Sequence, residues 1–316
     1  MAATICTKKF LLNSGFYMPA VGLGTWQGQV GSTAATEMRD TIVYALKQGY
    51  RHIDTAAVYG VEEIVGDAIR MSGVPRSEIF LVTKLHSTHH HKVEQAFKAS
   101  LARLGLDYID LYLMHWPQSL TEDGKHTDTP TPAETWLAME ALKKKYPDQV
   151  RSLGVSNFSQ KTMDELLKVA TIIPASNQIE VHPMLPQHEL IKYLQEKGIN
   201  VTCYSPLGQY NSPILKHPSI LALAEKHGVA AGQVILAWEV AKDLAVIPKS
   251  TNLKRIVENI TYPTLDTEDI RVLDQFYKGP GLHRRLCQIN GGTPTGHDIV
   301  MGWTYEQLGW EPYTIE

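Results

Sequence analysis

The chain has 316 residues, of which 43% are apolar and 20% are charged, and its formal net charge is −3. This composition is ordinary for a globular protein with its own core, and it lacks the basic excess typical of proteins that bind nucleic acid or anionic membranes. The three cysteines form no CxxC pair and no apolar run reaches the roughly 18 residues of a membrane span, so we expect a cytoplasmic protein without metal, disulfide or membrane anchor.

The first predicted element is a hairpin over Phe10–Met18, because Asn13-Ser14-Gly15 is a turn sequence between two short runs. Eight further runs, each bounded by turn residues, follow along the chain. They are Ala20–Gly24, Tyr50–Thr55, Ile79–Leu85, Tyr108–Trp116, Val150–Asn157, Ala175–His182, Asn200–Leu207 and Ala245–Ser250. Several are apolar almost throughout, which is typical of parallel strands buried on both faces.

Helical periodicity lies between these runs. From Val61 to Ile69 apolar residues recur with the i, i+3, i+4 spacing of an amphipathic helix, and the same spacing returns in 93–104 and 253–260. Eight strand–helix units predict an α/β fold, a TIM (β/α)8 barrel that includes residues 1–316 as one domain. A doubly wound open sheet is the alternative. Between Gly279 and about Thr304 the helical period is lost, so we expect residues 280–316 to form a C-terminal loop over the active site.

Four polar side chains stand just past the ends of three neighbouring strands: Asp54, Tyr59, Lys84 and His115. In a barrel this C-terminal face holds the active site. An ammonium group lowers the pKa of a nearby phenol, a carboxylate orients the ammonium, and a histidine can donate a hydrogen bond to an oxygen that gains charge. Each residue alone also fits a structural role. Together they predict protonation of the alkoxide that forms when hydride adds to a carbonyl.

Several ordered motifs at the same strand ends resemble the aldo-keto reductase family over about residues 10–280. They are GLGTW at Gly22–Trp26, HIDTA at His52–Ala56, Tyr59, Lys84, HWP at His115–Pro117, GVSNF at Gly154–Phe158, NQIEVHP at Asn177–Pro183, YSPLG at Tyr204–Gly208 and IPKS at Ile247–Ser250. The resemblance implies a TIM barrel, NADPH/NADP+ as cofactor and a monomer. It also implies that Tyr59 is the general acid, that Lys84 and Asp54 activate it, and that His115 orients the carbonyl.

The resemblance further implies a set of cofactor contacts. At the nicotinamide end, the residues that match hydrogen-bond partners of the carboxamide are Ser156, Asn157 and Gln178, and Tyr204 matches the ring that stacks on the nicotinamide. Ser205 and Leu207 match the pyrophosphate loop. The 2′-phosphate site is matched by Lys249, Ser250, Asn252 and Arg255, the adenine site by Glu258 and Asn259, and the set is completed by Thr25, Trp26 and Asp54. A phosphate dianion suits two cations beside a helix N-terminus. An ordinary basic helix start is the alternative.

The predicted substrate pocket is lined by Trp26, Tyr59, His115 and Trp116, and packing at the barrel top is the alternative role of the tryptophans. The family varies substrate preference through the loop at about Gln118–Pro132 and through the tail. Here the tail contains Leu282, His283, Arg284, Arg285 and Trp303. Its polar and cationic members favour small polar or anionic aldehydes, so glyceraldehyde, aldoses and uronates all stay open. His86 stands where many members have a tryptophan.

Two other functions fit parts of the same sequence. A non-catalytic NADPH-binding regulatory subunit of the same fold is the main alternative, and a metal-dependent barrel hydrolase is another. Gly22-Leu23-Gly24 lacks the third glycine of a dinucleotide fingerprint, since Gln27 occupies that place. The triplet His89–His91 cannot form one tetrahedral site, because adjacent helical residues point in different directions. We therefore expect a small carbonyl substrate and no metal, nucleic acid or membrane partner.

Overall fold

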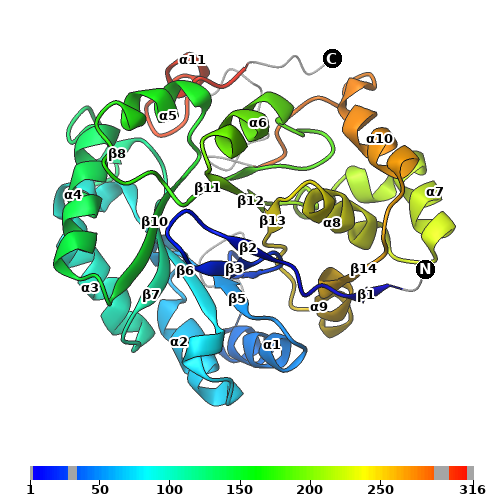
Figure 1. The fold of residues 1–316 in the computed structure, drawn as a ribbon, viewed down its shortest axis with the longest axis horizontal. Helices are drawn as coiled ribbons and strands as arrows, with labels where there is room; N and C mark the ends of the chain where they lie inside the picture. Colours follow the sequence, from blue (N-terminus) through cyan, green and yellow to red (C-terminus); the bar gives the residue numbers. More distant parts are fainter. Residues whose placement is uncertain (1–2, 28–33, 288–298, 312–316) are drawn as a thin grey trace.

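The computed structural model describes residues 3–27, 34–287 and 299–311. At its centre is an eight-stranded parallel sheet in the order β13-β12-β11-β10-β7-β6-β5-β4 (Figure 1). The strands are β4 (Leu23–Gly24), β5 (His52–Asp54), β6 (Phe80–Leu85), β7 (Ile109–Met114), β10 (Val150–Ser156), β11 (Ser176–Glu180), β12 (Asn200–Tyr204) and β13 (Ala245–Val246). Each lies within one of the eight predicted runs.

The two edges of this sheet meet. Val21, just before β4, forms a parallel bridge with Val246 on β13, and the Gly22 amide donates to the Val246 carbonyl at 2.8 Å. This contact closes the sheet into a barrel. The predicted (β/α)8 barrel is thereby confirmed, and the closure excludes the open doubly wound sheet.

Helices surround the barrel on its outside, as Figure 1 shows. They are α1 (Ala35–Lys47), α2 (Glu62–Ser72), α3 (Val93–Leu104), α4 (Pro132–Lys145), α5 (Gln160–Leu167), α6 (His188–Glu196), α7 (Pro218–His227), α8 (Ala231–Ala241), α9 (Leu253–Ile260), α10 (Thr267–Gln275) and α11 (Tyr305–Leu308). The three predicted helical stretches correspond to α2, α3 and α9. Within the described ranges no single helix is long and apolar enough to cross a membrane. In this part of the chain, α7 and α8 reach that length and composition only as a pair, and they are bent by 87°.

An N-terminal hairpin closes one end of the barrel. Strands β2 (Lys9–Leu11) and β3 (Tyr17–Pro19) pair antiparallel, which confirms the predicted hairpin. Leu12 and Met18 are buried in one cluster with residues from the barrel interior, Phe80, Val82, Leu111, Leu113, Ala175 and Ala245. Because Phe80 and Ala245 begin their strands, the hairpin covers the N-terminal end and leaves the opposite face for a site.

His52, from the HIDTA motif, has a structural role at this closed end of the barrel. His52 is fully buried and its Nδ1 lies 3.0 Å from the Pro19 carbonyl oxygen. A Cβ at Gly22 would lie 2.7 Å from the His52 ring, so only glycine fits beside it. The glycine and the histidine of these two motifs are therefore required together for barrel packing.

The described part of the tail lies against the loop that follows β7. Val300, Tyr305, Leu308 and Trp310 form a buried cluster in contact with Trp116. The Gln118 side-chain amide also donates to the Val300 carbonyl at 2.9 Å. Of the predicted loop 280–316, residues 288–298 and 312–316 lie outside the described residues. The described tail residues thus share one surface with the predicted specificity loop.

Candidate active site

The alternation of side chains along two strands places a lysine and a histidine above the barrel core. On β6, Phe80 and Val82 face the barrel interior, so Lys84, two residues further on, points the same way. On β7, Leu111 and Leu113 face the interior, and His115 follows them in the same register. The two polar side chains therefore enter the barrel at its C-terminal mouth.

The lysine is held by a carboxylate on the neighbouring strand. Lys84 is fully buried, and its Nζ donates to Asp54 Oδ1 at 2.7 Å and to the Thr55 carbonyl at 2.8 Å. Asp54 is the last residue of β5 and is 2% exposed. Two buried opposite charges with several hydrogen bonds form a rigid pair.

Tyr59 comes to this pair from a short helix. It ends the 3-10 turn η1 (Ala57–Tyr59), which Gly60 terminates in the left-handed region at φ 68°. The Lys84 Nζ lies 5.0 Å from the centre of the Tyr59 ring. The ring centre of Tyr59 is 5.7 Å from that of His115 and 5.0 Å from that of Trp26. The structure therefore brings the four predicted catalytic side chains together, with Trp26 beside them.

Burial decides the charge state of the phenol. It raises the pKa of Tyr59 well above its usual value near 10, and the negative charge of Asp54 raises it further. Burial also lowers the pKa of Lys84, against the opposing effect of Asp54. Burial and the Asp54 charge therefore set the net direction of the pKa of Tyr59 in this structure, and the lowering expected from the Lys84 ammonium stays a prediction. The phenol stays protonated at neutral pH and is a proton donor.

The histidine opposite the phenol is neutral. Burial lowers the pKa of His115 well below 6.5, and the charge of Lys84 lowers it further. Its Nδ1 is buried and has no hydrogen-bond partner among the described residues. A neutral imidazole at this place can direct an N–H toward a substrate oxygen without adding a second positive charge.

The predicted nicotinamide contacts are linked to Asp54 through hydrogen bonds. The Gln178 Nε2 donates to Asp54 Oδ2 at 2.7 Å, and the Ser156 hydroxyl donates to the Gln178 carbonyl at 2.8 Å. Thr25 donates to the Asp54 carbonyl at 3.0 Å. Strands β4, β5, β10 and β11 thus contribute one connected polar layer at the barrel mouth.

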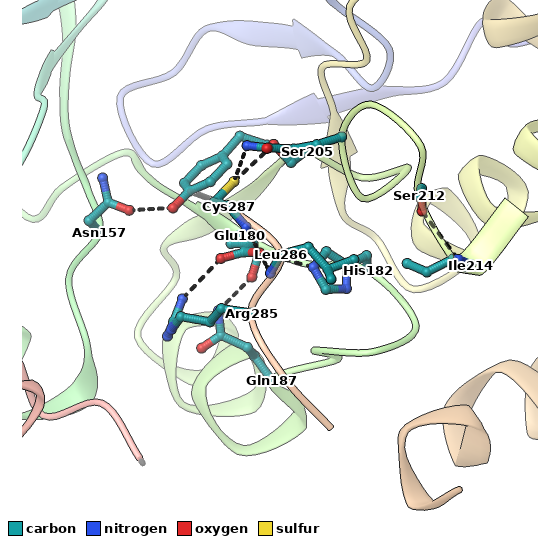
Figure 2. Close-up of polar contacts among 12 residues, drawn as sticks. Asn157, Glu180, His182, Gln187, Ser205, Ser212, Ile214, Arg285, Leu286 and Cys287 are labelled. Atoms are coloured by element: carbon teal, nitrogen blue, oxygen red, sulfur yellow. Dashed lines mark hydrogen bonds and ion pairs between the residues drawn. The ribbon is translucent and has the colours of Figure 1, made fainter. Parts of the chain in front are cut away.

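Asn157 extends this layer to the next strand. It lies just past β10 in the left-handed region at φ 66°. Its Nδ2 donates to the His115 carbonyl at 3.0 Å. Its Oδ1 accepts from the Tyr204 hydroxyl at 2.8 Å, which is the bond drawn from Asn157 in Figure 2. Tyr204 ends β12, so the predicted stacking ring is oriented by the predicted carboxamide ligand.

The predicted phosphate residues gather where α9 begins. Lys249 and Arg255 are exposed, and neither forms an ion pair with an acidic residue in the described ranges. Asn252 is the N-cap of α9 and accepts from the Arg255 amide at 3.0 Å, which commits its side-chain oxygen to the helix. Its backbone amide in turn donates to the buried Ser250 hydroxyl at 3.1 Å. Of the predicted adenine contacts, Asn259 is buried and Glu258 lies 3.5 Å from Lys254 on the same helix.

The predicted pyrophosphate loop contacts the described part of the tail. Ser205 adopts a left-handed conformation at φ 48°, and the Cys287 thiol donates to its hydroxyl at 3.1 Å (Figure 2). Burial raises the pKa of this thiol, so it stays protonated and acts as a donor. Leu207 is half-buried against the core. Cys287 was not among the predicted site residues, since a lone cysteine in an irregular tail has no distinctive sequence signal.

A tail tryptophan that was not among the predicted site residues, Trp310, lies beside the predicted substrate residue Trp116. Trp26 is 40% exposed at the mouth, and the Trp116 ring lies 5.9 Å from that of Trp310. The Arg285 guanidinium stacks 3.6 Å from the Trp310 ring and lies 3.4 Å from Glu180. The signal for Trp310 was present as an aromatic residue in the tail, but only the fold brings it to Trp116.

Two histidine side chains in the segment after β6, His86 and His90, form hydrogen bonds within the protein. His86 accepts from the Thr88 amide and starts the 3-10 stretch Ser87–Lys92, and burial lowers its pKa. His90 is buried with Nδ1 2.9 Å from the Ser119 hydroxyl. Among the described residues, no three His, Cys, Asp or Glu side chains are placed to hold a metal ion.

Comparison with known proteins agrees with this geometry. Residues 20–278 match the model of the aldo/keto reductase family. The chain is 44% identical to a glycerol 2-dehydrogenase (NADP(+)) of Saccharomyces cerevisiae, over 90% of this chain and 96% of that protein. It is 40% identical to a D-galacturonate reductase of Hypocrea jecorina, over 84% and 89% of the two chains.

A solved structure shares the fold at high similarity. It is a Bombyx mori aldo-keto reductase in complex with NADP, with a TM-score of 0.83 and 38% identity over 90% of this chain and 96% of that one. The family match covers most of the chain, and it includes Asp54, Lys84, His115 and Tyr204. The chain belongs to the aldo/keto reductase family of oxidoreductases.

Proposed function

We propose that this protein reduces small neutral aldehydes to alcohols with NADPH, and that Tyr59 is the proton donor. Family membership makes it an NADP-dependent oxidoreductase of carbonyl compounds. The observation that carries the residue assignment is the buried Lys84–Asp54 pair beneath a protonated Tyr59. A panel of carbonyl compounds assayed with NADPH and with NADH tests it. Turnover in that panel would also exclude the alternative of a non-catalytic cofactor-binding subunit.

The residues present fit the cofactor at both of its ends. Lys249 and Arg255, without acidic partners in the described ranges, offer two positive charges to a phosphate at the start of α9. At the barrel mouth, Asn157 and Gln178 belong to the connected polar layer, and Asn157 accepts a hydrogen bond from the Tyr204 hydroxyl. We assign the 2′-phosphate to the first group and the nicotinamide to the second.

In the proposed mechanism this chain supplies the proton and the orientation. NADPH, when bound, supplies the hydride that attacks the carbonyl carbon. The neutral His115 directs its N–H to the carbonyl oxygen and holds it near the Tyr59 hydroxyl. Tyr59 gives its proton to that oxygen as negative charge develops, and the adjacent Lys84 ammonium, held by Asp54, stabilises the phenolate left behind.

The substrate class follows from the charges of the pocket wall. Arg285 is 6% exposed and its charge faces the Glu180 carboxylate, so this member of the tail does not offer a free cation to an anionic aldehyde. This pairing takes one of the two tail arginines away from an anionic substrate, and we therefore favour glyceraldehyde and aldoses over uronates. The proposal also includes one barrel domain with residues 280–316 over the site, and a monomeric protein of the cytosol. Gel filtration tests the monomer.

Cofactor choice is expected to depend on Arg255. Arg255→Ala removes one cation from the proposed 2′-phosphate site and should weaken NADPH binding by about 1.5–3 kcal/mol, the range for hydrogen bonds to charged groups. NADH has no such phosphate and should bind as before. Fluorescence titration with both cofactors measures this. Arg271→Ala removes an exposed arginine from α10 and serves as the control. Equal losses for NADPH and NADH would contradict the assignment.

Substrate choice is expected to depend on Trp310. Trp310→Ala removes the ring that packs on Trp116 and opens the pocket wall on the tail side. The ratio of kcat/KM for a bulky aldehyde to that for glyceraldehyde should change by about 10-fold, because pocket contacts discriminate by roughly 1–3 kcal/mol. NADPH affinity should stay the same. Unchanged ratios across the aldehyde panel would remove Trp310 from the pocket.

A further inference from the structure

One buried carboxylate near the site has no part in the mechanism above. Glu180 ends β11, and its side chain is 0% exposed. Its Oε1 accepts from the backbone amides of Leu286 at 2.6 Å and Cys287 at 2.9 Å, and lies 3.0 Å from His182 Nε2. Its Oε2 lies 3.4 Å from Arg285 Nη1. Figure 2 shows these groups around the one carboxylate.

Three of the four groups come from one short piece of the tail, Arg285–Cys287, here called the strap. A buried carboxylate is stable only when several donors replace water. Burial alone would raise the pKa of Glu180, but the bond to His182 and the charge of Arg285 outweigh it and lower the pKa to about 2. Glu180 is therefore ionised at working pH. Without the strap, His182 would be the only remaining partner of the Glu180 carboxylate among the described residues, so the charge and the strap stabilise each other.

The strap contacts the proposed cofactor loop on one side. The Cys287 thiol donates to Ser205, and the Gln209 side-chain amide lies 3.2 Å from the Cys287 sulfur. A Cβ at Gly208 would lie 2.7 Å from a Leu286 methyl carbon, so the strap and the loop touch directly. Movement of the strap would therefore release this loop.

The strap contacts the substrate wall on the other side. Arg285 stacks 3.6 Å from the Trp310 ring, and Trp310 packs on Trp116. Trp116 directly follows His115 in the chain. One chain of contacts thus runs from Glu180 through Arg285 to the wall of the pocket.

We infer that Glu180 is a positioning residue that docks the strap and so sets both the cofactor loop and the Trp116–Trp310 wall. Its effect on substrate choice rests on the proposed function, whereas its effect on the strap does not. Glu180 is therefore distinct from the catalytic residues. It acts on the site through Arg285–Cys287 and does not touch the reacting atoms.

The decisive variant is Glu180→Gln in the full-length protein. It keeps the size of the side chain but removes its charge, and it replaces one acceptor with a donor that faces the strap amides. The first readout is tryptic cleavage after Arg284 and Arg285, located by mass spectrometry. Cleavage there should be about 10-fold faster than in the wild type, because proteolysis follows the population of the open strap.

The second readout is the split between KM and kcat. With saturating NADPH, kcat for glyceraldehyde should stay within about 3-fold of the wild type, since Tyr59 and Lys84 keep their contacts, while KM and the NADPH Kd should each rise about 10-fold. Glu239→Gln is the matched control. Glu239 is also a fully buried carboxyl, but burial raises its pKa, and it has no hydrogen-bond partner among the described residues.

Two outcomes would overturn the inference. The first is unchanged cleavage after Arg284 and Arg285 in Glu180→Gln. The second is a fall in kcat with KM and cofactor affinity unchanged. If Glu180→Gln does not fold, Arg285→Met is the deciding variant, because it removes the stacking on Trp310 without changing a barrel residue. It should give faster cleavage after Arg284 and an altered aldehyde preference. Unchanged values of both would refute the inference. Cleavage and NADPH binding need no turnover, so failure of the proposed function would leave this test valid.

Discussion

Tyr59→Phe is expected to lower kcat for aldehyde reduction by about 10²–10⁴, the range attributed to a general acid. Phenylalanine keeps the ring that packs on Trp26 and faces His115, and it removes only the hydroxyl. Burial keeps that hydroxyl protonated at neutral pH, so the wild type holds its donor in the acid form. Single-turnover and steady-state rates with NADPH measure the loss.

NADPH affinity should change little in this variant, because the phosphate and carboxamide contacts proposed above lie on other side chains. Tyr112→Phe is a matched control: Tyr112 is fully buried on β7, and its hydroxyl has no hydrogen-bond partner in the described part of the chain. Its loss should not affect kcat. Full aldehyde reduction by Tyr59→Phe with normal NADPH binding would exclude Tyr59 as the acid and leave His115 in that role.

Lys84→Met is expected to lower kcat to a similar extent, again by about 10²–10⁴, because the phenolate formed in the reaction loses its adjacent positive charge. The variant also leaves Asp54 buried with Gln178 as its remaining side-chain donor among the described residues. Breaking a buried ion pair in this way costs about 3–5 kcal/mol of stability. Denaturant unfolding therefore has to accompany the kinetic measurement.

The decreases in kcat caused by Tyr59→Phe and by Lys84→Met should not add. Groups that act as one unit lose most of their effect when either is removed, so the double variant Tyr59→Phe/Lys84→Met should be little slower than either single variant. Lys143→Met controls for stability, since Lys143 donates to two carbonyls on the outside of the barrel, at Val150 and Arg151. It should lose stability but keep kcat. A double variant slower by the product of the two single losses would mean that Lys84 acts independently of Tyr59.

The order of strands and helices could be predicted from the sequence, because buried parallel strands and amphipathic helices leave strong local patterns. The strand ends were less certain. The run predicted as Ala245–Ser250 is a strand only over Ala245–Val246, and the run Asn200–Leu207 ends as a strand at Tyr204. Past these points the chain turns out over the barrel mouth, and apolar content alone does not distinguish a strand from the buried loop that follows it.

The candidate site divides in the same way. Asp54, Lys84 and His115 could be proposed from the sequence because each ends or directly follows a strand, and parallel strands place such residues on one face. The shift in the pKa of Tyr59 could not be predicted from the sequence, because the direction of the shift depends on how much water the folded site excludes. The expectation from the Lys84 charge left out burial, which acts on this pKa in the opposite direction.

The barrel, the family and the residues that meet at the barrel mouth could be predicted from the sequence, since all of these rest on local pattern and strand order. The contacts of the tail could not, and they are seen only in the folded chain. Residues 285–287 are more than 100 positions from Glu180, and Trp310 is almost 200 from Trp116, yet each pair is in contact. Such contacts depend on how an irregular segment fits a surface that exists only after folding, and they leave no periodic signal in the chain.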